Sequence, residues 1–184
     1  MVSTVTPAGE LGMVAPTFDL PGVDGQRHTL ESTRGPAGLV VMFICNHCPY
    51  VKAVIDKIVR DTTELAVHGI GSLAISSNDP ADYPEDSFDN MQRFAAQHRM
   101  TIPYVYDESQ DVAKAYGAVC TPDFFGFDRT LRLAYRGRLD SSGRSAEPAA
   151  PRELFPAMVA IARGDAAPAK QHPSIGCSIK WRRA

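Results

Sequence analysis

The stretch of sequence that decides the fold joins an apolar run to two cysteines and reads Leu39-Val40-Val41-Met42-Phe43-Ile44-Cys45-Asn46-His47-Cys48-Pro49. The apolar run, residues 39–44, is typical of a strand buried on both faces of a sheet. The residues that follow have the apolar spacing of an amphipathic helix, which tolerates Pro49 in its first turn. We therefore predict a redox-active dithiol at the junction of a central strand and a helix.

Cys45 is the predicted nucleophile of this dithiol, and Cys48 is the predicted resolving thiol. If the helix begins near Cys48, its unpaired N–H groups and its dipole favour a thiolate at Cys45. A protonated His47 would favour that thiolate further, so we expect the pKa of Cys45 to lie in the roughly 3.5 to 7.5 range of activated CxxC thiols. Two intervening residues in a helical turn bring the two sulfurs into bonding range.

The composition fits a single globular domain over residues 1–184, because 44% of the residues are hydrophobic and can bury a substantial core. The two ends, residues 1–11 and 166–184, are expected to be loosely ordered. A net charge of -2 gives no reason to expect nucleic acid as a partner. No apolar run approaches the roughly 18 residues that a membrane span needs, so no membrane is expected either.

Cysteine usage and the first residues of the chain bear on its location. The 4 cysteines are too few for a disulfide-stapled domain of this size, and we expect reduced thiols. The N-terminus lacks the basic segment and apolar core of a secretory signal. We therefore expect a cytoplasmic protein.

Apolar periodicity predicts an α/β layered fold, because strands and helices alternate along much of the chain. Besides the central strand, the pattern predicts a hairpin within residues 12–30, helices at residues 51–59, 88–98, 112–116 and 154–161, and strands at residues 72–76, 104–106, 124–127 and 131–139. The connection between the last two strands, residues 128–130, is too short for a crossover. These two strands are therefore expected to run antiparallel.

Several segments spread over nearly the whole chain carry a family resemblance, namely residues 15–20, 45–51, 77–86, 116–125, 135–140 and 176–181. Together they resemble the thioredoxin superfamily and, within it, the alkyl hydroperoxide reductase/thiol-specific antioxidant (peroxiredoxin-like) branch of small bacterial proteins. The resemblance implies a thioredoxin-like fold, with a central mixed sheet flanked by helices and an N-terminal β-hairpin extension. It also implies that Pro122 is a cis-proline facing the dithiol and that Thr121 offers backbone hydrogen bonds to a bound substrate chain.

Two departures from better-known relatives limit what the resemblance implies. Peroxiredoxins carry a proline and a threonine in a Pro-x-x-x-Thr-x-x-Cys pattern, and neither residue precedes Cys45 at that spacing. Thioredoxins carry a buried aspartate six residues before the first cysteine, where this chain has Leu39. Another proton acceptor, or water, must therefore serve Cys48.

These observations favour a thiol-disulfide oxidoreductase that uses Cys45 and Cys48 in antioxidant or redox homeostasis. A first alternative is a thiol-dependent peroxidase that reduces hydroperoxides through Cys45. A second is a non-enzymatic thiol or metal-binding module, since a lone CxxC can be half of a zinc site. Because no second closely spaced pair of ligands follows, no metal is expected.

The expected partners follow from the same chemistry. The substrate is predicted to be a disulfide or a peroxide, and the reductant a thioredoxin or a small thiol. No organic cofactor is expected, because the electrons reside on sulfur.

Three further residues are candidate accessories of the site. Cys120 precedes the predicted cis-proline loop and is either a third redox thiol or a buried core residue, and the core role is favoured because unpaired cysteines are often buried. Cys177, in the C-terminal tail, is a candidate resolving or regulatory thiol. Arg138 is a candidate to assist a thiolate or an anionic substrate, although it shares a strand face with Arg132 and Arg136 that we expect to be a solvated edge.

Overall fold

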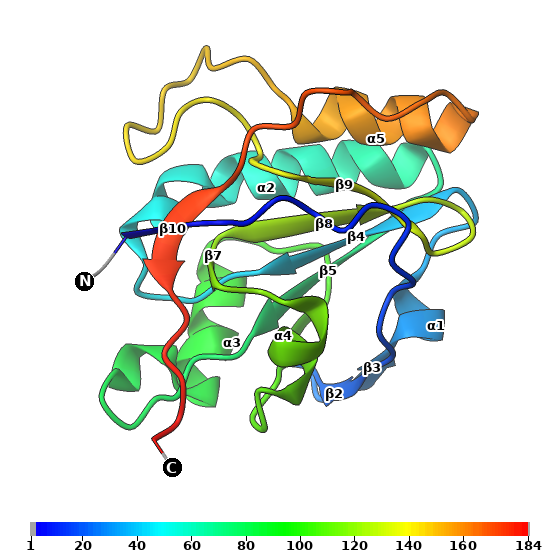
Figure 1. Ribbon diagram of the computed structural model, residues 1–184. Helices are drawn as coiled ribbons and strands as arrows, with labels where there is room; N and C mark the ends of the chain where they lie inside the picture. Colours follow the sequence, from blue (N-terminus) through cyan, green and yellow to red (C-terminus); the bar gives the residue numbers. More distant parts are fainter. Residues whose placement is uncertain (1–2, 184) are drawn as a thin grey trace.

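The structure is a computed structural model that describes residues 3–183 (Figure 1). Its main feature is a five-stranded sheet with the order β6-β5-β4-β8-β9. The strands are β4 (Gly38–Phe43), β5 (Ile70–Ser76), β6 (Tyr104–Tyr106), β8 (Asp123–Phe127) and β9 (Leu133–Gly137). The first three run parallel to one another, and β8 runs antiparallel to both of its neighbours, so the predicted mixed sheet is confirmed.

Strand β4 is the central strand, and its apolar side chains are buried on both faces of the sheet. Residues 39–44 are all 0% exposed. Val40 and Met42 pack on the face covered by the helices α2 (Pro49–Val67), α3 (Phe88–Gln97) and α5 (Leu154–Arg163). Leu39, Val41 and Phe43 pack on the opposite face, against α1 (Leu30–Thr33) and α4 (Asp111–Tyr116). The strands and helices predicted from periodicity therefore form the expected layers.

The N-terminal hairpin predicted within residues 12–30 is also present. It consists of β2 (Asp19–Pro21) and β3 (Arg27–Thr29), which pair antiparallel. Leu20 and the preceding Phe18 belong to the core on the α1 and α4 side of the main sheet. The hairpin is thus packed against the domain.

A second small sheet contradicts the expectation that both ends of the chain are loosely ordered. It has the order β1-β10-β7, all antiparallel, and is called the edge sheet below; its strands are β1 (Ser3–Val5), β7 (Cys120–Thr121) and β10 (Ile175–Ser178). Strands this short show no usable periodicity, and they form here because residues distant in sequence supply backbone partners. Residues 1, 2 and 184 of those two ends lie outside the described residues.

The expectation that Arg136 lies on a solvated edge is wrong. Its guanidinium is buried, lies 4.5 Å from the centroid of the Phe125 ring and donates a 3.0 Å hydrogen bond to Asp123. Strand β9 is no open edge, because the Leu133 N–H donates to the carbonyl of Met13 in the N-terminal segment. Burial raises the pKa of Asp123 to about 6 despite the neighbouring Arg136.

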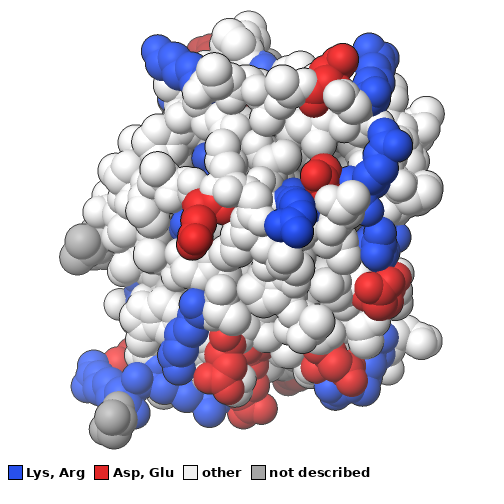
Figure 2. All heavy atoms as spheres, turned by 45° about the vertical axis from the view of Figure 1, so that its right-hand side comes forward, with Lys and Arg blue, Asp and Glu red and all other residues white. Residues whose placement is uncertain are grey.

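The surface carries mixed charge. On the face shown in Figure 2, cationic and anionic side chains of the described residues are interspersed and form no stripe of one sign. No helix between residues 3 and 183 has both the length and the apolar character required to cross a membrane. The expectation that neither nucleic acid nor a membrane is a partner stays a prediction.

Candidate functional site

The two cysteines of the CxxC motif lie at the junction between β4 of the five-stranded sheet and helix α2. Cys45 follows β4 closely, and Cys48 is the N-cap residue of α2. Both are 0% exposed, and the interaction between their thiols raises the pKa of Cys45 and lowers the pKa of Cys48. The Thr121–Pro122 peptide bond is cis, as the resemblance implied. Thr121 contacts both sulfurs, because its Oγ1 lies 3.3 Å from Cys45 Sγ and its carbonyl accepts a 3.1 Å hydrogen bond from Cys48 Sγ.

The contacts of the dithiol in this conformation favour ionisation of Cys48 over ionisation of Cys45. The hydrogen bond from Cys45 is the main cause that lowers the pKa of Cys48 to about 5, although burial opposes it. Further lowering comes from the Cys177 thiol and from the backbone N–H of Val51 in the first turn of α2. The structure thus contains an activated thiol, but at the second position of the motif.

The predicted acidic Cys45 is not supported in this reduced conformation and stays a prediction. Its pKa is raised well above the usual thiol value, because it shares a hydrogen bond with Cys48, is buried, and lies near the carboxylate of Asp86. The helix begins where the sequence predicted, with Cys48 as its N-cap residue and Pro49 as its first residue. The direction of the two pKa shifts therefore comes from the contacts between the sulfurs and their neighbours and not from a displaced helix start.

Asp86 is a site residue that the sequence analysis missed. It is 0% exposed and ends the 3-10 helix Pro84–Asp86. Its carboxylate accepts hydrogen bonds from the backbone N–H groups of Asn46 (2.9 Å) and His47 (3.2 Å), and from the Asn78 side chain (2.7 Å). Burial would raise its pKa, but these bonds and His47 hold the pKa below its usual value. The only signal in the sequence is its place in a segment that carries the resemblance.

His47 lies between Asp86 and the first sulfur. Its Nδ1 is 2.6 Å from Asp86 Oδ2 and 3.9 Å from Cys45 Sγ, and its ring stacks on Tyr83 at 4.9 Å between centroids. The Cys45 thiol, the His47 imidazole and the Asp86 carboxylate therefore lie in the order nucleophile, base and orienting group that is typical of an activated nucleophile. Because both contacts use Nδ1, the ring cannot carry a proton from one nitrogen to the other between Cys45 and Asp86 in this orientation.

Among residues 3–183, the same three residues form a group that could hold a metal ion. Cys45, His47 and Asp86 each offer one ligand atom, and these atoms lie within 4.8 Å of one another. Sulfur, imidazole nitrogen and carboxylate oxygen are donors that zinc accepts. A metal would have to displace hydrogen bonds that Asp86 already accepts, from His47 or from Asn78. The expectation that the protein binds no metal stays a prediction.

Cys177 is brought directly to the dithiol by the edge sheet. Its Sγ lies 2.9 Å from Cys48 Sγ, and its residue is paired with Thr121 in the register of β10 and β7. The Thr121 backbone, which the resemblance assigns to a bound substrate chain, is therefore paired with the protein's own C-terminal strand. Burial is the main cause that raises the pKa of Cys177 to about 12.

The other two candidate accessories have different surroundings. Cys120 is buried, and its Sγ donates to the Pro122 carbonyl at 3.6 Å, which supports its role as a core residue. Arg138 donates to Glu153 at 2.7 and 3.0 Å. Arg138 also lines the pocket beside Pro122 that is described below, and its predicted help to a thiolate or an anionic substrate stays a prediction.

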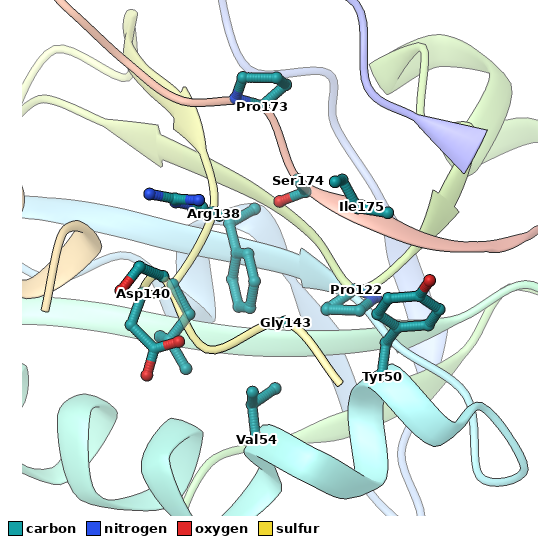
Figure 3. A pocket seen from close by; sticks show the side chains of 12 residues that line it. Tyr50, Val54, Pro122, Arg138, Asp140, Gly143, Pro173, Ser174 and Ile175 are labelled. Atoms are coloured by element: carbon teal, nitrogen blue, oxygen red, sulfur yellow. The ribbon is translucent and has the colours of Figure 1, made fainter. Parts of the chain in front are cut away.

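A pocket of about 150 Å³ adjoins the cis-proline (Figure 3). Tyr50 and Val54 of α2 form one side of it, Pro122 the floor, and Ser174 and Ile175 the side nearest to the C-terminal strand. Most of this lining is apolar. A group of a substrate that bound here would lie next to the cis-proline loop that carries Thr121.

Comparisons with known proteins agree with this geometry. Residues 11–136 match the model of the AhpC/TSA family. No curated protein matches the chain significantly. An uncharacterized conserved protein from Geobacillus kaustophilus is similar over 100% of this chain and 98% of its own, with 45% identity and a TM-score of 0.94. A hypothetical protein from Sinorhizobium meliloti is similar over 98% of this chain and 100% of its own, with 35% identity and a TM-score of 0.92.

A more distant structure identifies the fold. The thioredoxin domain of a thiol-disulfide oxidoreductase from Bacteroides vulgatus has a TM-score of 0.58 and 16% identity, and the match covers 70% of this chain and 89% of that domain. At this identity the likeness concerns the fold alone. The thioredoxin-like fold predicted from the sequence is thus confirmed.

Proposed function

The chain belongs to the AhpC/TSA family, and we propose that it is a thiol-disulfide oxidoreductase that works through Cys45 and Cys48 in antioxidant or redox homeostasis. Membership of the family supports an oxidoreductase that uses cysteine thiols. The observation that carries the narrower proposal is the pair of interacting thiols next to Thr121 and the cis-proline Pro122. Such a pair can form and release a disulfide without other groups.

The proposed reaction transfers two electrons from the dithiol to a substrate disulfide. The Cys45 thiolate attacks one substrate sulfur, a mixed disulfide forms, and the first substrate thiolate leaves. Cys48 then attacks Cys45 Sγ, the Cys45–Cys48 disulfide forms, and the second substrate thiolate leaves. The proton shared by the resting pair completes one substrate thiol, and a proton from solvent completes the other. A thioredoxin or a small thiol would afterwards return the dithiol to its reduced form.

The proton of Cys45 must move before this attack, because the contacts of the resting pair favour ionisation of Cys48. The interaction between the two thiols provides the path, since passing the shared proton to Cys48 leaves a thiolate on Cys45. The Thr121 hydroxyl, 3.3 Å away, can then donate to that thiolate. His47, if protonated, adds a positive charge near the same sulfur.

Trapping of the mixed disulfide tests the proposal. Cys48→Ser is expected to accumulate a mixed disulfide with a model protein substrate on Cys45, since resolution is blocked, whereas Cys45→Ser is expected to form none. Cys120→Ser is the matched control and should turn over as the unmodified protein does. A mixed disulfide on Cys48 in the Cys45→Ser protein would reverse the proposed roles. No exchange in any variant would overturn the activity.

A thiol peroxidase is the second candidate, and one contact favours it. The Thr121 hydroxyl lies where it could hydrogen-bond a peroxide next to Cys45, although it comes from a different part of the chain than the threonine of peroxiredoxins. Cys45 would attack one peroxide oxygen, the other oxygen would leave as water or an alcohol after protonation, and the sulfenic acid would condense with Cys48 and release water. Stopped-flow oxidation by hydrogen peroxide beside a model disulfide, read by Trp181 fluorescence, distinguishes the two activities.

A metal-binding role is the third candidate and is tested separately. Metal analysis of protein purified without a chelator would detect zinc held by Cys45, His47 and Asp86. Retained stoichiometric metal without a redox cycle would support this role. The cytoplasmic location expected from the sequence stays a prediction, and fractionation of cells would test it.

A further inference from the structure

The C-terminal strand is fixed across the dithiol. Figure 1 shows β10 beside β1 and across the N-terminal end of α2, against which it packs. The Ser174 carbonyl before the strand accepts a 3.0 Å hydrogen bond from the Thr6 N–H, and the Lys180 N–H after it donates to Asn78 at 2.9 Å. Cys177 is therefore held in place on both sides by contacts with distant segments.

A glycine allows this close approach. A Cβ on Gly176 would overlap the carbonyl oxygen of Thr121, so only a residue without a side chain fits between β10 and the cis-proline loop. The next residue, Cys177, then lies opposite Thr121. The chain thus brings a third sulfur to the same threonine that contacts the other two.

Cys48 is the central sulfur of the three. It interacts with the Cys45 thiol on one side and lies 2.9 Å from Cys177 Sγ on the other. A disulfide needs about 2.05 Å between sulfurs, so a small rotation of either side chain would close a Cys48–Cys177 bond. All three thiols are buried, with exposed fractions of 0%, 0% and 2%.

We propose that Cys177 is a third redox thiol of the site and takes over the disulfide from the Cys45–Cys48 pair. This inference rests on the proposed function, which supplies the oxidised pair. Cys177 Sγ attacks Cys48 Sγ, the Cys48–Cys177 bond forms, the Cys45–Cys48 bond breaks, and Cys45 leaves as a thiolate. The proton of Cys177 ends on Cys45. No electrons are gained or lost, and Cys45 is again a thiol while the disulfide is held between α2 and β10.

The charges around Cys177 support the direction of this exchange. Besides burial, its high pKa in the reduced protein comes from the hydrogen bond to Cys48 and from the charge of Cys48. Both of these causes disappear once Cys48 is in a disulfide. Burial still raises the pKa of Cys177 and Lys180 and Arg144 still lower it, so the loss of the two contributions from Cys48 makes Cys177 a better nucleophile when its target has formed.

Disulfide mapping of the unmodified protein tests the proposal. Reduced protein is mixed with one equivalent of oxidised glutathione, quenched in acid at increasing times, alkylated and digested with trypsin. Cys45 and Cys48 share the peptide of residues 35–52, whereas Cys177 lies in residues 171–180. We expect a bond within the first peptide to appear early and a bond between the two peptides to replace it, with alkylated Cys45 in the linked product.

The outcomes separate this proposal from the proposed function. A bond within residues 35–52 that never passes to residues 171–180 would overturn the role of Cys177 and leave the oxidoreductase intact. No disulfide at all would overturn both. Cys177→Ser should stop at the first bond, while Cys120→Ser, a matched buried cysteine of the edge sheet, should give the same map as the unmodified protein.

A second variant keeps the test independent of how Cys177→Ser folds. Cys45→Ser retains Cys48 and Cys177, and mild oxidation of this protein should link residues 35–52 to residues 171–180 as the main product. A link that uses Cys120 instead, or monomer without any link, would contradict the geometry on which the proposal depends.

Discussion

The five-stranded sheet and the edge sheet are held by different interactions. In the five-stranded sheet, β4 is fully buried and packs apolar side chains on both faces. In the edge sheet, the strands have two to four residues, and Val5 and Ile175 are about half exposed. The first is stabilised mainly by burial of apolar surface, whereas the second depends on backbone pairing and a few close contacts.

This difference matters because the candidate site lies where the two sheets meet. The end of β4 supplies Cys45, the start of α2 supplies Cys48, and the edge sheet supplies Thr121 and Cys177. The position of the dithiol is therefore set by the most stable part of the fold, while its surroundings are set by a part with far less buried apolar surface. Changes in the edge sheet should alter sulfur chemistry with a smaller loss of stability than changes in the core of the five-stranded sheet.

Phe125→Ala should have the largest effect, because it removes a buried ring of the five-stranded sheet. Phe125 is 0% exposed and contacts the rings of Phe43 and Tyr116. The cavity should cost about 3 to 5 kcal/mol of unfolding free energy, measured by urea denaturation. Ile175→Ala in the edge sheet is the comparison, with an expected loss below about 0.5 kcal/mol. Equal losses would refute the difference between the sheets.

Asp86→Asn should cost about 1.5 to 3 kcal/mol at neutral pH, because charge-assisted hydrogen bonds from His47 and Asn78 are lost. The folded-state pKa of Asp86 is lowered, so its contribution is present above about pH 4 and is lost as the pH falls through that folded-state value. Urea denaturation from pH 7 to pH 3 should show the gap between the two proteins closing in acid. A gap that widened in acid would contradict the assigned direction.

Gly176→Ala tests the edge sheet alone. The added Cβ overlaps the Thr121 carbonyl oxygen, so β10 must move, at an expected cost of about 1 to 3 kcal/mol. The same movement should expose Cys48, which should react faster with an alkylating reagent. Ile175→Ala, one residue earlier in the strand, is the control and should leave that rate unchanged. An unchanged rate in Gly176→Ala would show that β10 does not cover the dithiol.

Substitutions at the dithiol should have the smallest effect on stability. Titration of the thiolate by ultraviolet absorbance reports on the site most directly. One thiol is expected to ionise at a pKa of about 5, and Cys48→Ser should abolish this step. Cys45→Ala removes the main cause of the lowered pKa and should move it upward, towards the free-cysteine value of about 8.5. Cys120→Ser should leave the curve unchanged. An ionisation step at low pH that persists in Cys48→Ser would show that Cys45 carries the thiolate.

Sequence alone located the dithiol, but the direction of the Cys45 pKa shift that it predicted differs from the direction that the contacts in the structure favour. The motif and the apolar run placed Cys45 and Cys48 at the strand–helix junction, because both signals are local and strong. The helix begins at Pro49, as expected, but Asp86, Thr121 and Cys177, which shift the pKa values of the two thiols, are distant in sequence. Asp86 was missed because nothing in its neighbours marks it as buried.

What the sequence determined by itself was the five-stranded sheet, its helices and the place of the CxxC motif. The apolar run of residues 39–44 and the apolar spacing of the helix that follows determine which side chains are buried, so local pattern and final structure agree. Only the tertiary structure decided how closely other residues surround the dithiol. Thr121, Asp86 and Cys177 reach it through a cis-peptide loop, a short 3-10 helix and a four-residue strand, which form only when distant segments supply their partners.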